Sequence, residues 1–159
     1  MKINLVCVGK VKEEFYRAAI AEYEKRMQRY SRLTITEVSD EKTPDKLSDR
    51  EREVILDKEG ERIIGALNKD DFVIALAIEG KQKSSKELAA FLDEHMIFDG
   101  RDLSFVIGGS LGLSQSVMKR ADMSLSFSKM TFPHQLMRII LLEQIYRSFR
   151  IMRGEPYDK

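Results

Sequence analysis

Two short segments of this chain combine glycine, hydroxyl and sulfur-bearing residues in a way that suits a small-molecule site. Residues 108–112 read Gly-Gly-Ser-Leu-Gly, and residues 126–134 read Ser-Phe-Ser-Lys-Met-Thr-Phe-Pro-His. Glycine lets a backbone approach a ligand closely, although the same residues also suit a plain structural turn. The spacing G-x-G-x-x-G of dinucleotide sites is absent, and so is the Gly-Lys-Ser/Thr of a P-loop. The two segments therefore predict a ligand site if the fold brings them together.

His134 is the candidate for proton transfer, because its imidazole titrates near neutral pH. Pro133 precedes it, and we expect this proline to be the first residue of a long helix, where no donor is needed. The helix dipole favours a neutral imidazole there, so His134 either handles a proton or is a partly exposed first-turn residue. We expect His95 to lie on a surface helix without a function. Two distant histidines and one cysteine predict no metal site.

The elements that must position these segments alternate between strand and helix. Serine and glutamate three residues apart form capping boxes at Ser48 and Ser84. Apolar, β-branched runs predict strands at residues 3–8, 33–38, 72–78, 103–107 and 123–127. Helical spacing predicts helices at residues 16–30, 48–67 and 84–96, after Ser114, and from Pro133 onward. Such alternation predicts an α/β fold, with a parallel sheet and helices on both faces. Ligands bind at the carboxyl ends of such strands.

Composition limits the classes of protein to consider. The 159 residues suit one domain, 1–159, and 43% hydrophobic with 33% charged residues describe a globular protein. The net charge is only +1, but residues 129–159 hold six bases against three acids, so an anionic partner would dock there. Cys7 lies in an apolar run and is expected in the core. No signal peptide or membrane segment is evident, so we expect a cytoplasmic protein.

The last helix is apolar over an unusually wide face. The apolar side chains are Leu136, Met137, Ile139, Ile140, Leu141, Leu142, Ile145, Tyr146 and Phe149. One face of a sheet needs a narrower stripe, so the excess is buried either by the rest of the chain or by a second subunit. We favour a homodimer, because a terminal helix packs easily across a two-fold axis. Arg147, Arg150 and Arg153 follow the other side, where they are solvated, paired or directed at phosphates.

Several motifs of the chain match those of a known protein family. Five segments carry the resemblance: the opening M-K-I-x-L-x-x-V-G-K, Leu76 to Gly80, Phe105 to Ser110, Leu125 to Gln135, and the tail Met152 to Tyr157. From end to end, the chain resembles the ribosomal RNA large subunit methyltransferase H family. This family is a minimal group within the SPOUT, or trefoil-knot, methyltransferases. The resemblance implies a knot in the C-terminal part, which the rarity of knots would otherwise exclude.

The resemblance also implies a cofactor, a substrate and site residues. It implies a bent S-adenosylmethionine bound by Leu76, Gly108, Phe127, Ser128, Lys129, Met130, Thr131 and Phe132. It implies an obligate homodimer that methylates N3 of pseudouridine 1915, in helix 69 of 23S rRNA, on the large subunit or the 70S ribosome. His134 is the candidate general base. The tail residues Arg153, Tyr157 and Lys159 are the candidates for RNA binding.

One residue departs from the family pattern, and other functions stay open. The family tail usually reads Tyr-His before a basic residue, whereas Asp158 follows Tyr157 here. An acid beside RNA phosphates is unfavourable, which puts a tail role for that position in doubt. The alternatives are methylation of another RNA such as tRNA, and a non-catalytic ribosome-associated RNA-binding protein. A flavin- or nucleotide-binding α/β protein would also fit the pattern of elements alone.

Overall fold

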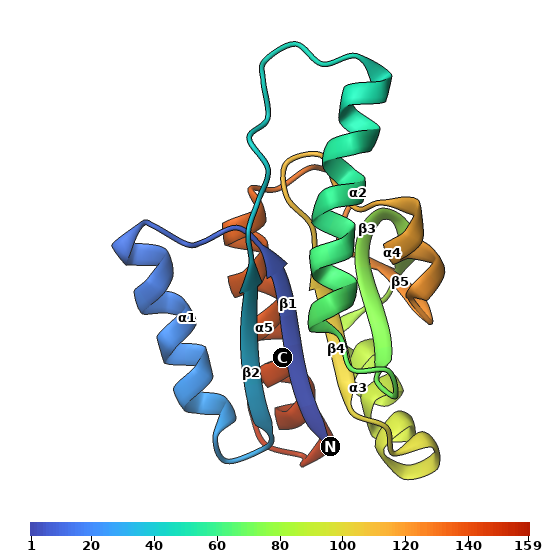
Figure 1. Cartoon of the computed structure of the whole chain (residues 1–159). Coiled ribbons are helices and arrows are strands. Elements are labelled where there is room, and N and C mark those ends of the chain that lie inside the picture. Colours follow the sequence, from blue (N-terminus) through green and yellow to red (C-terminus); the bar gives the residue numbers. More distant parts are fainter.

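The computed structural model describes residues 1–159 and contains one five-stranded sheet (Figure 1). The strands are β1 (Lys2–Val8), β2 (Arg32–Val38), β3 (Phe72–Gln82), β4 (Leu103–Ile107) and β5 (Met123–Ser126). Their order across the sheet is β2-β1-β4-β3-β5, and every neighbouring pair is parallel. The predicted fold class, an α/β protein with a parallel sheet, is confirmed.

Helices cover both faces of the sheet. They are α1 (Glu14–Met27), α2 (Asp49–Ala66), α3 (Ser85–Glu94), α4 (Gln115–Arg120) and α5 (His134–Met152). The helices α1 and α3 both pack against α5 on one face, whereas α2 packs with α4 on the other (Figure 1). No helix combines the length and the apolar character needed to cross a membrane.

Two hydrophobic clusters lie on the two faces, because neighbouring residues of a buried strand point in opposite directions. On β1, Ile3, Leu5 and Cys7 belong to the large cluster under α1, α3 and α5, and Val6 and Val8 belong to the small one under α2 and α4. All five are almost fully buried, which confirms the core position expected for the cysteine. Burial of each aliphatic side chain contributes roughly 1.5–3 kcal/mol to the free energy of folding.

The starts of the helices follow the sequence signals, with one correction. Ser48 accepts from the backbone N–H of Glu51, and Ser84 does the same with Glu87, so both capping boxes are confirmed. Pro133, however, is the residue before α5 and has an extended ψ of 132°. The helix therefore begins at His134, one residue later than predicted. Proline still suits this position, because a backbone N–H just before the helix would have no acceptor within the helix, and proline has none to leave unpaired.

The strand β3 is longer than predicted and is interrupted by a bulge. Leu76 and Lys81 both pair with Leu125 of β5, so residues 77–80 lie outside the ladder. A Cβ on Gly80 would lie 2.8 Å from the backbone nitrogen of Leu125. Glycine at this position therefore lets the chain pass close to β5 before pairing resumes at Lys81. The predicted end at residue 78 was wrong because the hydrophobic pattern stops there, although the strand does not.

His95 is also placed differently from the prediction. It is only 6% exposed and lies in a π-helical turn, η1 (His95–Asp99), that continues α3. Its ring centroid lies 4.9 Å from that of Phe72, and its Nε2 lies 2.8 Å from the carbonyl oxygen of Arg101. The prediction of a surface position failed because His95 follows the buried Leu88 and Leu92 at helical spacing, on the face of α3 that packs against the sheet.

The apolar face of α5 is covered partly by the chain itself. Leu141, Leu142, Ile145 and Phe149 are buried in the large cluster. Leu136, Met137, Ile139 and Ile140, nearer the start of the helix, are only partly covered. The chain itself therefore covers the middle of the face, and the first half of the helix has apolar surface left for a partner.

Arg138 anchors the start of α5 to the ends of two strands. Its side chain is 1% exposed, and its guanidinium donates to a carboxylate oxygen of Glu37 at 2.5 Å. The same group donates to the carbonyl oxygens of Val8 at 3.2 Å and Gly9 at 2.7 Å. Charge-assisted hydrogen bonds of this kind are stronger than neutral ones. The guanidinium therefore fixes α5 against β1 and β2, one turn after His134.

Arg138→Met should destabilise the protein while keeping much of the buried volume. We expect the free energy of unfolding to fall by about 3 kcal/mol, the low end for breaking a buried pair, because Glu37 keeps some contact with water. Urea denaturation followed by circular dichroism measures this loss. The matched control is Arg52→Met, at an exposed arginine without a salt bridge, which should change stability by less than about 0.5 kcal/mol. Equal losses in the two variants would contradict the anchoring role.

Candidate active site

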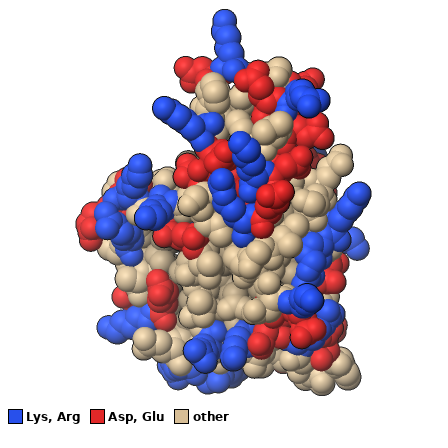
Figure 2. All heavy atoms as spheres, in the orientation of Figure 1, with Lys and Arg blue, Asp and Glu red and all other residues tan.

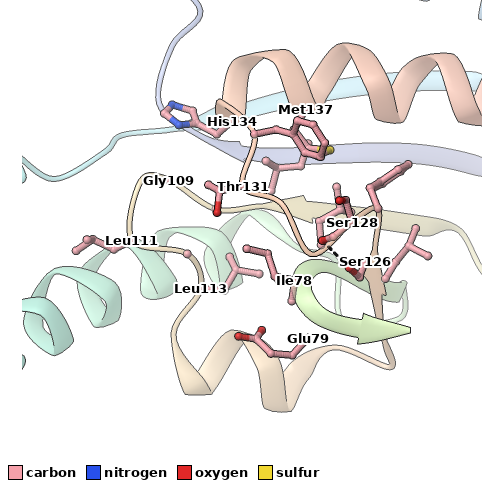
Figure 3. A pocket seen from close by; sticks show the side chains of 18 of the residues that line it. Ile78, Glu79, Gly109, Leu111, Leu113, Ser126, Ser128, Thr131, His134 and Met137 are labelled. Atoms are coloured by element: carbon pink, nitrogen blue, oxygen red, sulfur yellow. Dashed lines mark hydrogen bonds between the residues drawn. The ribbon is translucent and has the colours of Figure 1, made fainter. Parts of the chain in front are cut away.

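A cavity of about 410 Å³ opens at the carboxyl ends of β3, β4 and β5 (Figure 3). Three segments of the chain form most of its wall: residues 76–79, residues 107–113, and residues 125–132 apart from Lys129. Met118, His134 and Met137 complete it. The fold thus brings together the two segments that the sequence singled out, at the edge where parallel sheets bind ligands.

The glycine loop 108–112 is shaped by its own backbone. A Cβ on Gly108 would collide with the carbonyl group of Gly112, and Gly112 itself has a φ of +91°. A hydrogen bond from the N–H of Gly112 to the carbonyl oxygen of Gly109, at 3.1 Å, closes the turn. The glycine at position 108 is therefore required by the turn, whether or not a ligand approaches it.

The loop that follows β5 is held by two of its own hydroxyl groups. Ser126 donates from its side chain to the carbonyl oxygen of Ser128 at 3.1 Å, and the hydroxyl of Ser128 accepts from the N–H of Met130 at 3.0 Å (Figure 3). These bonds order the loop without help from neighbouring elements. The Met130 side chain remains 73% exposed.

Most of the predicted cofactor residues lie at this cavity. Leu76, Gly108, Phe127, Ser128, Met130, Thr131 and Phe132 belong to its wall. Lys129 does not, although its neighbours on both sides do. His134 lies at the rim, in the first turn of α5 (Figure 3).

The sequence did not identify several other wall residues. The bulge supplies Ala77, Ile78 and Glu79, which had been assigned to the end of a strand. Met137 lies one helical turn after His134, and this i, i+3 spacing was the signal that could have found it. Leu111 and Leu113 come from the glycine loop and its continuation.

The cavity carries little charge. Glu79 supplies the one carboxylate in the wall, and no lysine or arginine side chain belongs to it. Burial lowers the pKa of His134 below its usual 6.5, and the positive charge of Arg138 lowers it further, against a smaller opposing effect of Asp40 and Glu13. The imidazole is therefore neutral at neutral pH and can accept a proton.

The tail residues lie far from the cavity of their own chain. The 19 residues of α5 span about 28 Å between His134 and the start of the tail. Arg153 and Lys159 are exposed, whereas Tyr157 is partly buried and donates from its hydroxyl to Glu143 at 3.1 Å. The structure therefore separates the two groups of predicted site residues.

The charges around the tail are mostly paired. Arg147 forms salt bridges with Glu143 at 2.7 Å and with Asp158 at 3.0 Å. Arg150 pairs with Glu155 at 3.0 Å. Asp158 therefore holds the tail against α5, and its charge is balanced by Arg147. Paired arginines were one of the expected arrangements, and it applies to Arg147 and Arg150, whereas Arg153 follows the end of α5 and forms no salt bridge.

Comparisons with known proteins agree with this architecture. The family model described as "Predicted SPOUT methyltransferase" matches residues 1–158. A solved structure, the tRNA (m1G37) methyltransferase from Aquifex aeolicus, matches 100% of this chain and 75% of its own with a TM-score of 0.53. At 12% identity, that likeness concerns the fold alone. The protein is thus a SPOUT methyltransferase by family and by fold.

Relatives narrow the assignment further. A protein of Bacillus pumilus named "Ribosomal RNA large subunit methyltransferase H" is 56% identical over 159 residues, which cover 100% of both chains. A Bacillus thuringiensis protein of the same name is 55% identical over the same full length. The chain belongs to the ribosomal RNA large subunit methyltransferase H family.

The lowered pKa of His134 has a measurable consequence. Because the unfolded imidazole titrates near 6.5 and the folded one titrates lower, protonation favours the unfolded state. The stability that neutral His134 contributes is therefore complete above pH 6.5 and declines as the pH falls toward its folded pKa. Proton NMR of the two histidines, assigned with His134→Gln, should give a midpoint below 6.5 for His134. A midpoint at or above this value would contradict the environment described.

Proposed function

We propose that this protein uses S-adenosylmethionine to methylate N3 of pseudouridine 1915, in helix 69 of 23S rRNA, on the large subunit or the assembled ribosome. The observation that carries the proposal is the cavity between the glycine loop and the loop after β5, in a chain that is 56% identical to a ribosomal RNA large subunit methyltransferase H. Such a substrate would be met in the cytoplasm.

The cavity suits this cofactor. A volume of about 410 Å³ falls within the roughly 300–1,000 Å³ of small-molecule sites. The apolar side chains of Leu76, Leu113 and Phe127 suit the adenine ring, and the backbone groups of residues 108–112 and 126–132 suit its polar edges. Glu79 provides the single negative charge in the wall, which favours a cationic sulfonium. Lys129 lies outside the wall, so the proposal assigns it no contact with the cofactor.

When bound, S-adenosylmethionine supplies an electrophilic methyl group. The protein has to hold the acceptor nitrogen in line with it, so positioning accounts for much of the rate. The acceptor nitrogen must also lose its proton. His134, neutral and at the rim, is the proposed group that accepts this proton.

The proposed fold includes the trefoil knot of the SPOUT methyltransferases. Two features support it: the bulge at residues 77–80 packs its Gly80 against the backbone of β5, and α5 follows directly from the loop at this place. Membership of the SPOUT family supports it independently.

We propose a homodimer in which the tail of one subunit serves the cavity of the other. Within one chain, Arg153 lies about 28 Å along α5 from His134, and Tyr157 returns only as far as Glu143 near the middle of the helix. Antiparallel packing of two α5 helices would remove this separation, since the tail of each would then lie at the start of the other. The partly covered Leu136 and Ile140 provide apolar surface for such a contact.

The alternatives explain fewer observations. A non-catalytic ribosome-binding protein would not need a cavity of this size, with a neutral imidazole at its rim. A tRNA substrate would fit the same chemistry, but the full-length relatives are named for ribosomal RNA. A flavin- or nucleotide-binding protein lacks support from the family match.

The test is methyl transfer to defined substrates. We expect the protein to methylate large subunits or 70S ribosomes from a strain that lacks the modification, and not to methylate tRNA. Mass mapping of the nucleosides should find the new methyl group on pseudouridine 1915. Incorporation into tRNA alone would contradict the proposed substrate, and absence of transfer to every RNA would favour the non-catalytic alternative.

Cofactor binding is tested with a variant that fills the cavity. Ile78→Trp enlarges a wall residue that is 46% exposed and outside the ladder, so the sheet should be preserved. Calorimetric titration should detect S-adenosylmethionine binding to the wild type and at least tenfold weaker binding to this variant. Gly108→Ala is a poorer test, because it would disrupt the turn itself. Equal affinities would show that the cofactor binds elsewhere.

The shared site is tested by mixing two inactive variants. Ile78→Trp inactivates the cavity, and Arg153→Gln with Tyr157→Phe inactivates the tail. Random assortment gives half mixed dimers with one intact site each, so co-refolded mixtures should recover roughly a quarter of wild-type methyl transfer. Light scattering should report twice 18.4 kDa for each protein. Dimers without any recovery would contradict a tail that acts on the partner's cavity.

A further inference from the structure

Five exposed cations gather at the edge of the sheet opposite the cavity, where β1 and β2 begin. These residues, called the basic patch below, are Lys2, Lys25, Arg29, Arg32 and Arg153. They come from the start of β1, the end of α1, the start of β2 and the tail. Figure 2 shows basic atoms gathered below the beginning of β1 and β2.

Two pairs of these cations lie close together, one on each face of the sheet. Lys2 and Arg32 are register partners on neighbouring parallel strands, so their side chains leave the same face side by side. The guanidinium carbons of Arg29 and Arg153 lie 5.2 and 4.7 Å from the ring centre of Tyr30. Two cations that contact the same ring repel each other unless an anion lies between them.

The acids nearby do not neutralise the basic patch. Glu155 accepts from the hydroxyl of Tyr30 at 2.7 Å and pairs with Arg150 at 3.0 Å, and it approaches Arg29 only at 4.0 Å. Asp102 accepts from the backbone N–H of Lys2 at 2.7 Å. The side chains of Lys2, Lys25, Arg32 and Arg153 form no salt bridge. The basic patch therefore has an excess of positive charge available to an external anion.

We infer that the basic patch is a docking surface for the phosphate backbone of the RNA substrate. Arginine forks match phosphate oxygens in pairs, and phosphate contacts supply much of the affinity of proteins for nucleic acids. A protein partner would need apolar anchors, and the segments that carry the basic patch, residues 1–2, 25–32 and 153–159, contain none of the exposed large hydrophobic side chains of this chain. The inference rests on the proposed function, because it takes RNA as the substrate, and it adds four residues outside the tail.

The position of the basic patch defines its role. Arg153 lies about 28 Å along α5 from His134, and the other members lie where β1 and β2 begin, so the basic patch takes no part in methyl transfer within its own chain. In the proposed dimer, it would anchor the RNA backbone while the modified base enters the cavity of the partner subunit. Its loss should therefore raise KM for ribosomal substrate and leave kcat nearly unchanged.

The test removes three cations that lie outside the tail. Lys25→Gln, Arg29→Gln and Arg32→Gln, combined in one variant, should bind large ribosomal subunits about tenfold more weakly at low salt. In filter binding across a series of KCl concentrations, the slope of log affinity against log salt should fall by about two to three.

A matched control removes the same charge elsewhere. Lys46→Gln, Lys86→Gln and Lys119→Gln replace three exposed lysines scattered over the β2–α2 loop, α3 and α4. This variant should keep its affinity within about twofold of the wild type, since scattered charges are largely screened at a Debye length of about 10 Å. Urea denaturation and light scattering of both variants check that fold and dimer are kept.

The outcomes separate the inference from the proposed function. Equal weakening in the two triple variants would overturn the basic patch, because net charge alone would then explain the effect. A monomeric Lys25/Arg29/Arg32 variant would also overturn it, since the surface would be a subunit contact. If the wild type binds subunits through the basic patch but transfers no methyl group, the inference holds and the proposed function fails.

Discussion

The arrangement of the candidate site depends on one buried guanidinium. Arg138 ties α5 to the carboxyl ends of β1 and β2 through Glu37 and two backbone carbonyl oxygens. The loop after β5 leads into this helix, so its far end is fixed wherever α5 is fixed. The same charge lies close enough to His134 to lower its pKa. One interaction thus holds the cavity wall in place and adds to the effect of burial on the pKa of His134 at its rim.

The sequence predicted the parts of this molecule that depend on local rules. Strand runs, both capping boxes and the buried cysteine follow from periodicity and hydrogen-bonding chemistry within a few residues. The bulge in β3 and the burial of His95 were missed, because they depend on contacts with Leu125 and with Phe72, Phe91 and Arg101. For the site, the two loops were found by their residue types, but Glu79 was not, since its role depends on a bulge that no pattern marks. The pairing of Asp158 with Arg147 likewise follows only from the return of the tail along α5.

The charges of the chain are divided between two ends of the sheet. The cavity at one end contains a single carboxylate and a neutral imidazole, whereas five exposed cations, four of them without a salt bridge, lie at the other. A weakly charged pocket suits a cofactor that must leave after each turnover, and a strongly charged surface suits a large anionic partner. The net charge of +1 conceals this division completely. The positions of the charged residues, and not their total number, therefore indicate which partners each end of the sheet can bind.

The bulge in β3 also affects how this protein can change over evolutionary time. Residues 77–79 form part of the cavity wall, yet they contribute nothing to the pairing of β3 with β5. Substitutions there can alter the shape and polarity of the pocket without shifting the register of any strand. Gly80 and the ladder on both sides are constrained, so variation is confined to one short segment. A lineage could therefore acquire new ligand preferences at this wall while the folding of the sheet stays under unchanged selection.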